Sequence, residues 1–173
     1  MDDASGVDDE PVWKAKRAAG DPRATRHLTF SCHDRLPLFH RAATRDAFVR
    51  ALLAADAAGS IRLHAWVVMP EHVHLLVSEG SEPLPAAMAR LKACFARDTL
   101  RLWRAERPGA VRRLVTADGK TRFWLTGGGH DRWMRSDEDS QEKATYVVAN
   151  PVRRGLVERP ADWKWSSAWR GPR

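Results

Sequence analysis

Residues able to do chemistry gather first in Met69–Val77, an apolar run that contains His72 and His74 two positions apart. In a β-strand, residues i and i+2 share a face, so both imidazoles project to one side while the apolar residues after each histidine point to the other. Two imidazoles suit a divalent transition ion, which usually needs a third or fourth ligand. The alternative is a polar strand face with two solvated or hydrogen-bonded histidines.

A second group lies near the end of the chain, where Tyr146 and Asn150 are four residues apart and therefore share a face of a predicted helix. The carbonyl oxygen of Asn150 could ligate a hard cation. Tyr146 is the only tyrosine in the chain. A lone helical tyrosine often fills an interface, but a phenolate can also attack phosphorus and form a covalent phosphotyrosine. Its free pKa of about 10 means that it needs help from a metal or a cationic neighbour.

The elements that must position these residues follow from hydrophobic periodicity. Strands are predicted at residues 26–33, 61–69, 72–77 and 122–125, and helices at 44–58, from 85 to about 104, and from about 137 to 150. The triple glycine at 127–129 is expected to interrupt the pattern, and Pro151 to end the last helix. The alternation predicts one face with Phe30, Leu63, Val67 and Leu75, and an opposite, open face with Thr29, Ser31, His64, Trp66, His72 and His74.

The order strand, helix, strand, strand, helix, strand predicts an α+β fold of the ferredoxin-like, split βαβ type. Two helices should cover one face of an antiparallel sheet, and the C-terminal helix should lie on or beside the other. The length of 173 residues suits one hydrophobic core. Residues 1–22 are predicted to be a flexible lead-in, and residues 23–173 a single catalytic domain.

The charge distribution favours a polyanionic partner. Residues 1–10 hold five acids and no base, so removing that −5 from the net charge of +7 leaves +12 on residues 11–173. Arginines make up most of this excess, which favours nucleic acid. Arg90, Arg97, Arg101 and Arg104 fall on a narrow stripe of a predicted helix, as either a solvated face or a ridge that follows phosphates.

Composition also bears on the expected location of the protein. No apolar run approaches the roughly 18 residues of a membrane span, and the acidic start lacks the features of a signal peptide. Cys32 and Cys94 are far apart and are expected to be reduced core residues. The sequence therefore predicts a cytoplasmic protein with no membrane partner, which would be nucleoid-associated if its polyanionic partner is DNA.

Together the two motifs resemble a known family. Met69-Pro70-Glu71-His72-Val73-His74-Leu75-Leu76-Val77 resembles the His-hydrophobe-His strand of the HUH single-strand nucleases. The stretch from Tyr146 to Val157 resembles the catalytic-helix signature of the REP-associated tyrosine transposases. Residues 65–69 and 163–167 also fit, so the resemblance covers about residues 24–169.

This resemblance implies metal-dependent cleavage and transfer of single-stranded DNA, often beside a hairpin, through a 5′-phosphotyrosine and a free 3′-hydroxyl. It implies Tyr146 as the nucleophile, His72 and His74 as ligands of Mg²⁺ or Mn²⁺, and Asn150 at the third ligand position. Candidate DNA contacts are Arg90, Arg97, Arg101, His130, Arg153 and Arg154. His130 could also be a surface group or an extra ligand, although a DNA contact or a surface role is favoured.

Two other functions compete with this interpretation. The first is a non-catalytic module that binds single-stranded or hairpin nucleic acid on the open sheet face, using Trp66 and the arginines. The second is a metal hydrolase with water as the nucleophile, for which Glu71 is the only evident base, and Glu71 is expected to face away from the histidines. The sequence leaves open a monomer or a homodimer, and an active site built within one chain or between two.

Overall fold

A computed structural model describes residues 24–171, so the predicted lead-in at residues 1–22 lies outside the described residues. The chain forms β1 (Arg26–Cys32), α1 (Ala42–Ala57), β2 (Ile61–Val68), β3 (His72–Glu79), α2 (Leu84–Glu106), α3 (Pro108–Arg112), β4 (Trp124–Trp133) and α4 (Asp137–Arg153). Short 3₁₀ helices, η1 (His33–Arg35) and η2 (Pro160–Asp162), follow β1 and α4.

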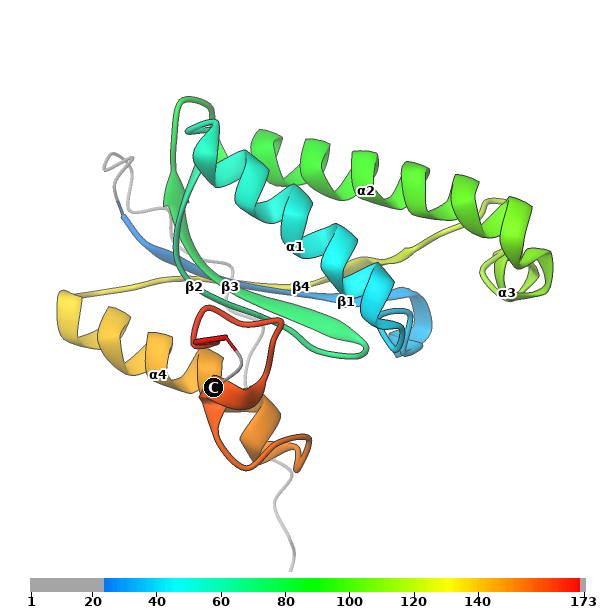
Figure 1. The fold of residues 1–173 in the computed structure, drawn as a ribbon. Coiled ribbons are helices and arrows are strands. Elements are labelled where there is room, and N and C mark those ends of the chain that lie inside the picture. The colour runs from blue at the N-terminus through cyan, green and yellow to red at the C-terminus, as the bar shows by residue number, and fades with distance from the viewer. Residues whose placement is uncertain (1–23, 172–173) are drawn as a thin grey trace, which may run out of the picture.

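The four strands of the described residues form one antiparallel sheet in the order β2-β3-β1-β4. Helices α1 and α2 cover one face, and α4 lies against the other (Figure 1). This is the arrangement that the split βαβ order predicts. The fold prediction is confirmed, with α4 on the second face of the sheet.

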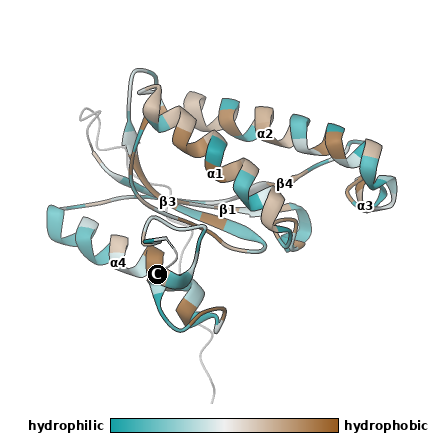
Figure 2. Cartoon of the chain, viewed as in Figure 1, coloured by the Kyte–Doolittle hydropathy of each residue, from teal (hydrophilic) through white to brown (hydrophobic). Residues whose placement is uncertain are grey.

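The larger core lies between the sheet and helices α1 and α2. Aromatic rings fill its centre: the centroids of Phe48 and Phe95 are 4.9 Å apart, and those of Phe39 and Phe123 are 5.5 Å apart. Figure 2 shows hydrophobic residues along α1, α2 and the strands, and hydrophilic residues toward the start of α4. Burial of these rings from water is the main stabilising contribution of this layer.

A smaller core holds α4 on the opposite face of the sheet. It consists of buried Ala65, Val67, Met69, Leu76, Val147 and Trp163. The indole nitrogen of Trp163 donates a hydrogen bond of 3.0 Å to the Val68 carbonyl, so the segment after α4 is also fixed to β2. The sheet is therefore buried on both faces near its centre.

A β-bulge in β2 corrects the predicted alternation. Leu63 pairs with Val77 and Ala65 pairs with Leu76, so His64 is an extra residue in this strand. Beyond the bulge every side chain changes face. Trp66 therefore packs in the core under α1 and α2, and Val67 packs under α4. The predictions that Trp66 lies on the open face and that Val67 faces the two helices are wrong.

The sequence pattern predicted that the triple glycine interrupts the last strand, but the strand continues through it. Strand β4 continues through it to Trp133, because residues 125–128 bulge out opposite the single residue Ser31 of β1. Gly127 has a φ of 71°, a left-handed conformation that glycine adopts without steric cost. The bulge lets β4 pair with β1 on both sides of it.

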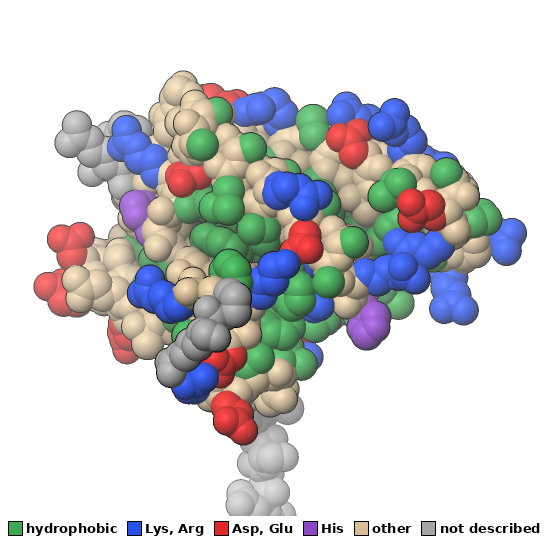
Figure 3. Space-filling model, viewed as in Figure 1, with side chains coloured by type: hydrophobic (Ala, Val, Ile, Leu, Met, Phe, Trp, Pro, Cys, Tyr) green, Lys and Arg blue, Asp and Glu red, His purple; other side chains and the backbone are tan. Residues whose placement is uncertain are grey.

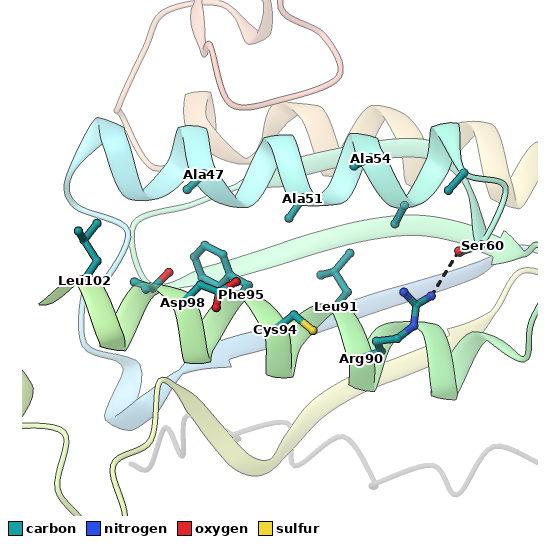
Figure 4. Close-up of a pocket in the computed structure, with 13 residues that line it drawn as sticks. Ala47, Ala51, Ala54, Ser60, Arg90, Leu91, Cys94, Phe95, Asp98 and Leu102 are labelled. Atoms are coloured by element: carbon teal, nitrogen blue, oxygen red, sulfur yellow. Dashed lines mark hydrogen bonds between the residues drawn. The ribbon is translucent and has the colours of Figure 1, made fainter. Parts of the chain in front are cut away.

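Small side chains on α1 allow α2 to pack beside it. Ala47, Ala51 and Ala54 face Leu91 and Phe95 across a hollow of about 480 Å³ (Figure 4).

No helix in the described part of the chain combines the length and apolarity that crossing a bilayer requires.

Gly80, directly after β3, is expected to tolerate no side chain. A Cβ there would collide with the backbone of Gly59 and lie 2.6 Å from the Ser60 carbonyl carbon. We expect Gly80→Ala to lower the free energy of unfolding by about 2–3 kcal/mol, because backbone atoms must move to make room. Urea unfolding followed by circular dichroism measures the change. Gly109→Ala is the matched control, since the nearest atom is 3.6 Å away, and a comparable loss in the control would contradict the steric explanation.

Candidate active site

The imidazoles of His72 and His74 converge on one point on the α4 side of β3. Their Nε2 atoms are 3.0 Å apart, and their ring planes are nearly perpendicular, at 88°. The apolar residues between and after them face the larger core, as the strand alternation predicts. Two ligands at about 2.1 Å from one ion and at right angles around it lie roughly 3.0 Å apart, so the pair fits a divalent cation.

Hydrogen bonds to the other ring nitrogens hold the two imidazoles in place. Nδ1 of His72 lies 3.1 Å from Oε1 of Glu71, and Nδ1 of His74 lies 2.8 Å from the hydroxyl of Thr29. Such partners orient metal-binding histidines in proteins. Arg154, at the end of α4, donates a 2.7 Å hydrogen bond to the same Glu71 oxygen. The prediction that Glu71 faces away from the histidines is wrong.

Burial keeps the imidazole pair neutral. It lowers the pKa of His74 to about 3, with a further contribution from the charge of His72. Burial also lowers the pKa of His72, although the neighbouring Glu71 carboxylate opposes this effect. At neutral pH both rings therefore have a free lone pair on one nitrogen, the form in which histidine ligates metals.

Tyr146 lies beside the imidazole pair, although it comes from a different element. Its ring centroid is 6.2 Å from that of His74, and the two rings meet edge to face. The Nζ of Lys143 lies 4.6 Å from the tyrosine centroid, and the Cζ of Arg153 lies 5.1 Å from it. Two cations thus flank the phenol ring, where they would attract the negative charge of a bound phosphate.

Asn150 is buried and bonds to its own helix. Its Nδ2 donates to the carbonyls of Tyr146, at 2.9 Å, and Val147, at 3.2 Å. Pro151 has no N–H to give to the Val147 carbonyl, and the Asn150 amide takes its place. Helix α4 therefore continues through Pro151 to Arg153, and the prediction that it ends at Asn150 is wrong. The side-chain oxygen of Asn150 is the atom left for a ligand.

Two further histidines surround the pair. His27 is buried and stacks on His74, with centroids 5.4 Å apart and ring planes 12° apart. Burial lowers the pKa of His27 to about 4, aided by the charge of Lys143. His130, on β4, is exposed, and its ring lies 5.8 Å from that of His27. Within the described residues, no group of three or more His, Cys, Asp or Glu side chains could hold a metal ion.

Comparisons with known proteins show which family this chain is similar to in sequence. No protein-family model matches the chain. It is 26% identical over 109 residues to the REP-associated tyrosine transposase of Escherichia coli K12, a match that covers 61% of this chain and 53% of that protein. A Haemophilus influenzae protein named for the same family is 29% identical over 102 residues, or 58% of this chain and 54% of that protein. The resemblance to the REP-associated tyrosine transposases is confirmed.

The fold gives an independent comparison. A solved structure of a REP-associated tyrosine transposase bound to a REP hairpin superposes with a TM-score of 0.59. The match has 20% sequence identity and covers 86% of both chains, so it shows a shared fold. The chain spans about half the length of the curated relatives that it matches in sequence.

The structure brings some predicted site residues together and separates others. His72, His74, Tyr146 and Asn150 lie on the α4 side of the sheet, with Arg153 over the tyrosine ring and Arg154 bound to Glu71. Arg90, Arg97 and Arg101 lie on α2, which covers the opposite face. Arg90 is ion-paired with Glu82, and Arg97 with Asp98 at 3.0 Å. Their role as DNA contacts stays a prediction.

Sequence patterns did not single out Thr29, His27 or Lys143 as site residues. Thr29 is the register partner of His74 across β1 and β3, and strand pairing of this kind cannot be read from one sequence. His27 shares a strand face with Thr29, which was the available signal. Lys143 lies three residues before Tyr146, a spacing at which helical side chains meet.

The role of Asn150 within the helix can be tested by its coupling to Pro151. We expect Asn150→Ala to lower the free energy of unfolding by about 1–3 kcal/mol, because it leaves a buried carbonyl of Val147 without a donor. In a Pro151→Ala background the new backbone N–H can donate to that carbonyl, so the same change should cost at least about 1 kcal/mol less. Urea unfolding of the four proteins measures this. Equal losses in both backgrounds would show that the two residues are not coupled.

Proposed function

We propose that this chain is an enzyme of the REP-associated tyrosine transposase type. It would cleave single-stranded DNA through Tyr146 and transfer the bound strand. The observation that carries the proposal is the position of the only tyrosine, with its ring centroid 6.2 Å from that of His74 in a convergent histidine pair. A nucleophile, two potential metal ligands and flanking cations are the groups that such a reaction needs.

The proposed substrate is single-stranded DNA next to a hairpin. The matched structure is of a transposase bound to a REP hairpin, and the sequence relatives have the same family name. The net charge of +7 supports a polyanionic substrate. These similarities support the substrate class, and the DNA sequence preferred by this chain is a matter for experiment.

The proposed reaction is a phosphoryl transfer to the phenol. The Tyr146 oxygen attacks the scissile phosphorus and loses its proton, while the bond from phosphorus to the 3′ oxygen breaks and that oxygen takes up a proton. The products are a 5′-phosphotyrosine and a free 3′-hydroxyl. Attack by a 3′-hydroxyl on the phosphotyrosine reverses the exchange, so strands can be rejoined without ATP because the number of phosphoester bonds is unchanged.

Several residues of the site would stabilise the negative charge that the reaction places on the phenol oxygen and the phosphate. Lys143 and Arg153 lie over the phenol ring and would stabilise the phenolate and the pentavalent phosphorus. His72 and His74, with the side-chain oxygen of Asn150, are the proposed ligands of Mg²⁺ or Mn²⁺. Such an ion, when bound, supplies positive charge that polarises and orients the scissile phosphate. Glu71 and Thr29 would hold the two imidazoles in the required orientation.

The structure supports the alternative functions less well. A binding module that stacks bases on the open sheet face would need Trp66 there, but Trp66 is buried under α1 and α2. A hydrolase with water as nucleophile would need a free carboxylate as base. Burial by itself raises the pKa of Glu71, but the hydrogen bonds and charges of Arg154 and His72 together hold that pKa below its ordinary value. A carboxylate with so low a pKa is a weak base.

The nucleophile is tested by Tyr146→Phe. We expect the variant to form no covalent adduct with a labelled hairpin-containing single strand and Mn²⁺ on a denaturing gel, because it lacks the attacking oxygen. The phenyl ring keeps the packing against the second core, so hairpin binding should change less than about threefold. An adduct in this variant would exclude the proposed role, because the chain has no other tyrosine.

The metal ligands are tested by His72→Gln and His74→Gln. We expect each to weaken Mn²⁺ binding by about 100-fold or more in isothermal titration, because each removes one of two converging nitrogens. EDTA should abolish adduct formation by the unchanged protein, and excess Mn²⁺ should restore it. His40→Gln is the matched control, since His40 is exposed and lies outside the pair. Adduct formation that is indifferent to EDTA would argue against a metal-dependent reaction.

A further inference from the structure

Five arginines gather at one end of the molecule, around the end of α2 and α3. They are Arg41, Arg104, Arg107, Arg112 and Arg113, and we name them the α2–α3 arginine surface. No ion pair in the described part of the chain includes any of them. Four are exposed, and Arg107 is half-buried. Figure 3 shows Lys and Arg side chains over this region.

The arginines of this surface form no ion pair within the described residues. Burial lowers the pKa of Arg107, and so does the charge of Arg41, while the carboxylate of Glu106 opposes both effects. The Nε of Arg107 is buried without a hydrogen-bond partner. Arg112 and Arg113 line an open hollow of about 610 Å³ beside them. Like charges placed together in this way are stabilised by a bound anion.

This surface and the candidate active site lie at the same end of the sheet. The loop between β1 and α1 connects them, because the Phe39 amide donates to the Pro70 carbonyl at 2.9 Å, directly before Glu71 and His72. Arg41 follows two residues later. Arg35, in the same loop, is also exposed. Two arginines, Arg35 and Arg41, therefore lie on the segment that connects the candidate active site with the α2–α3 arginine surface.

The chemistry of the surface indicates which form of DNA it binds. Proteins that hold single strands combine positive charge with exposed aromatic rings on which bases stack. No aromatic side chain of α2 or α3 is exposed, and Trp103 is buried beneath Arg107, whose Cζ lies 4.7 Å from the indole centroid. Guanidinium groups alone contact the phosphates of a duplex and hold it without reading its sequence.

We propose that the α2–α3 arginine surface binds the phosphate backbone of the duplex stem of a hairpin, while the adjoining single strand enters the site of Tyr146. This inference rests on the proposed function for the identity of the substrate. It adds a second binding surface, separate from the residues that would cleave the strand.

The double variant Arg112→Gln/Arg113→Gln tests this proposal in a Tyr146→Phe background, where cleavage cannot interfere. Fluorescence anisotropy at several salt concentrations would use two labelled probes: a DNA hairpin with a single-stranded extension, and a strand of the same length that cannot pair. We expect hairpin binding to weaken by about 10- to 50-fold near 0.1 M salt. The slope of log affinity against log salt should fall by about 2, roughly 0.9 for each lost phosphate contact. Binding of the unpaired strand should change less than about threefold.

The matched control is Arg159→Gln/Lys164→Gln, which changes the net charge equally but removes basic side chains that already have carboxylate partners, Asp162 at 2.8 Å and Asp46 at 3.1 Å. Its loss of hairpin affinity should be much smaller. Equal losses in both double variants, equal losses on both probes, or an unchanged salt slope would each overturn the proposal. These binding results do not depend on Tyr146, so a failure of the proposed cleavage, seen as no adduct with the unchanged protein, is a separate result.

Discussion

The packing of α4 against the second face of the sheet is the constraint on which the candidate site depends. Val147 is fully buried in that small core, and it places Tyr146 beside His74 and Asn150 one turn further along the helix. The same core includes Val67 and Leu76 from the strands that carry and flank the histidines. A sheet covered on one face only would have the imidazole pair but no nucleophile beside it.

Burial on both faces also explains what the sequence could predict. The strand order and the two-residue spacing of His72 and His74 were sufficient for the fold and for the shared face of the imidazoles, because both depend on local periodicity. Beyond His64 the pattern failed, since Val67 and Trp66 are both buried, on opposite faces, and hydrophobicity cannot distinguish them. A bulge changes register by one residue without altering the apparent alternation.

Two other predictions from the sequence were wrong for local reasons. In one case a side chain takes the place of a backbone hydrogen-bond donor, and in the other the residue lies just before its strand begins. Pro151 was expected to end α4, but the Asn150 amide donates to the Val147 carbonyl in place of the missing N–H, and the helix continues. Glu71 precedes β3, so strand alternation does not set its direction, and its carboxylate reaches His72. Contacts such as that of Glu71 with Arg154 join residues far apart in the chain, which a single sequence does not reveal.

The presence of one tyrosine has a consequence for stoichiometry. A single phenol can hold one DNA end at a time, so under the proposed reaction each chain carries one strand between breakage and rejoining. Excision of a DNA segment has two boundaries, and it would require either two copies working together or two successive rounds by one copy. Because each chain has one nucleophilic tyrosine, each excision needs at least two cleavage events, whether two copies or one copy carries them out.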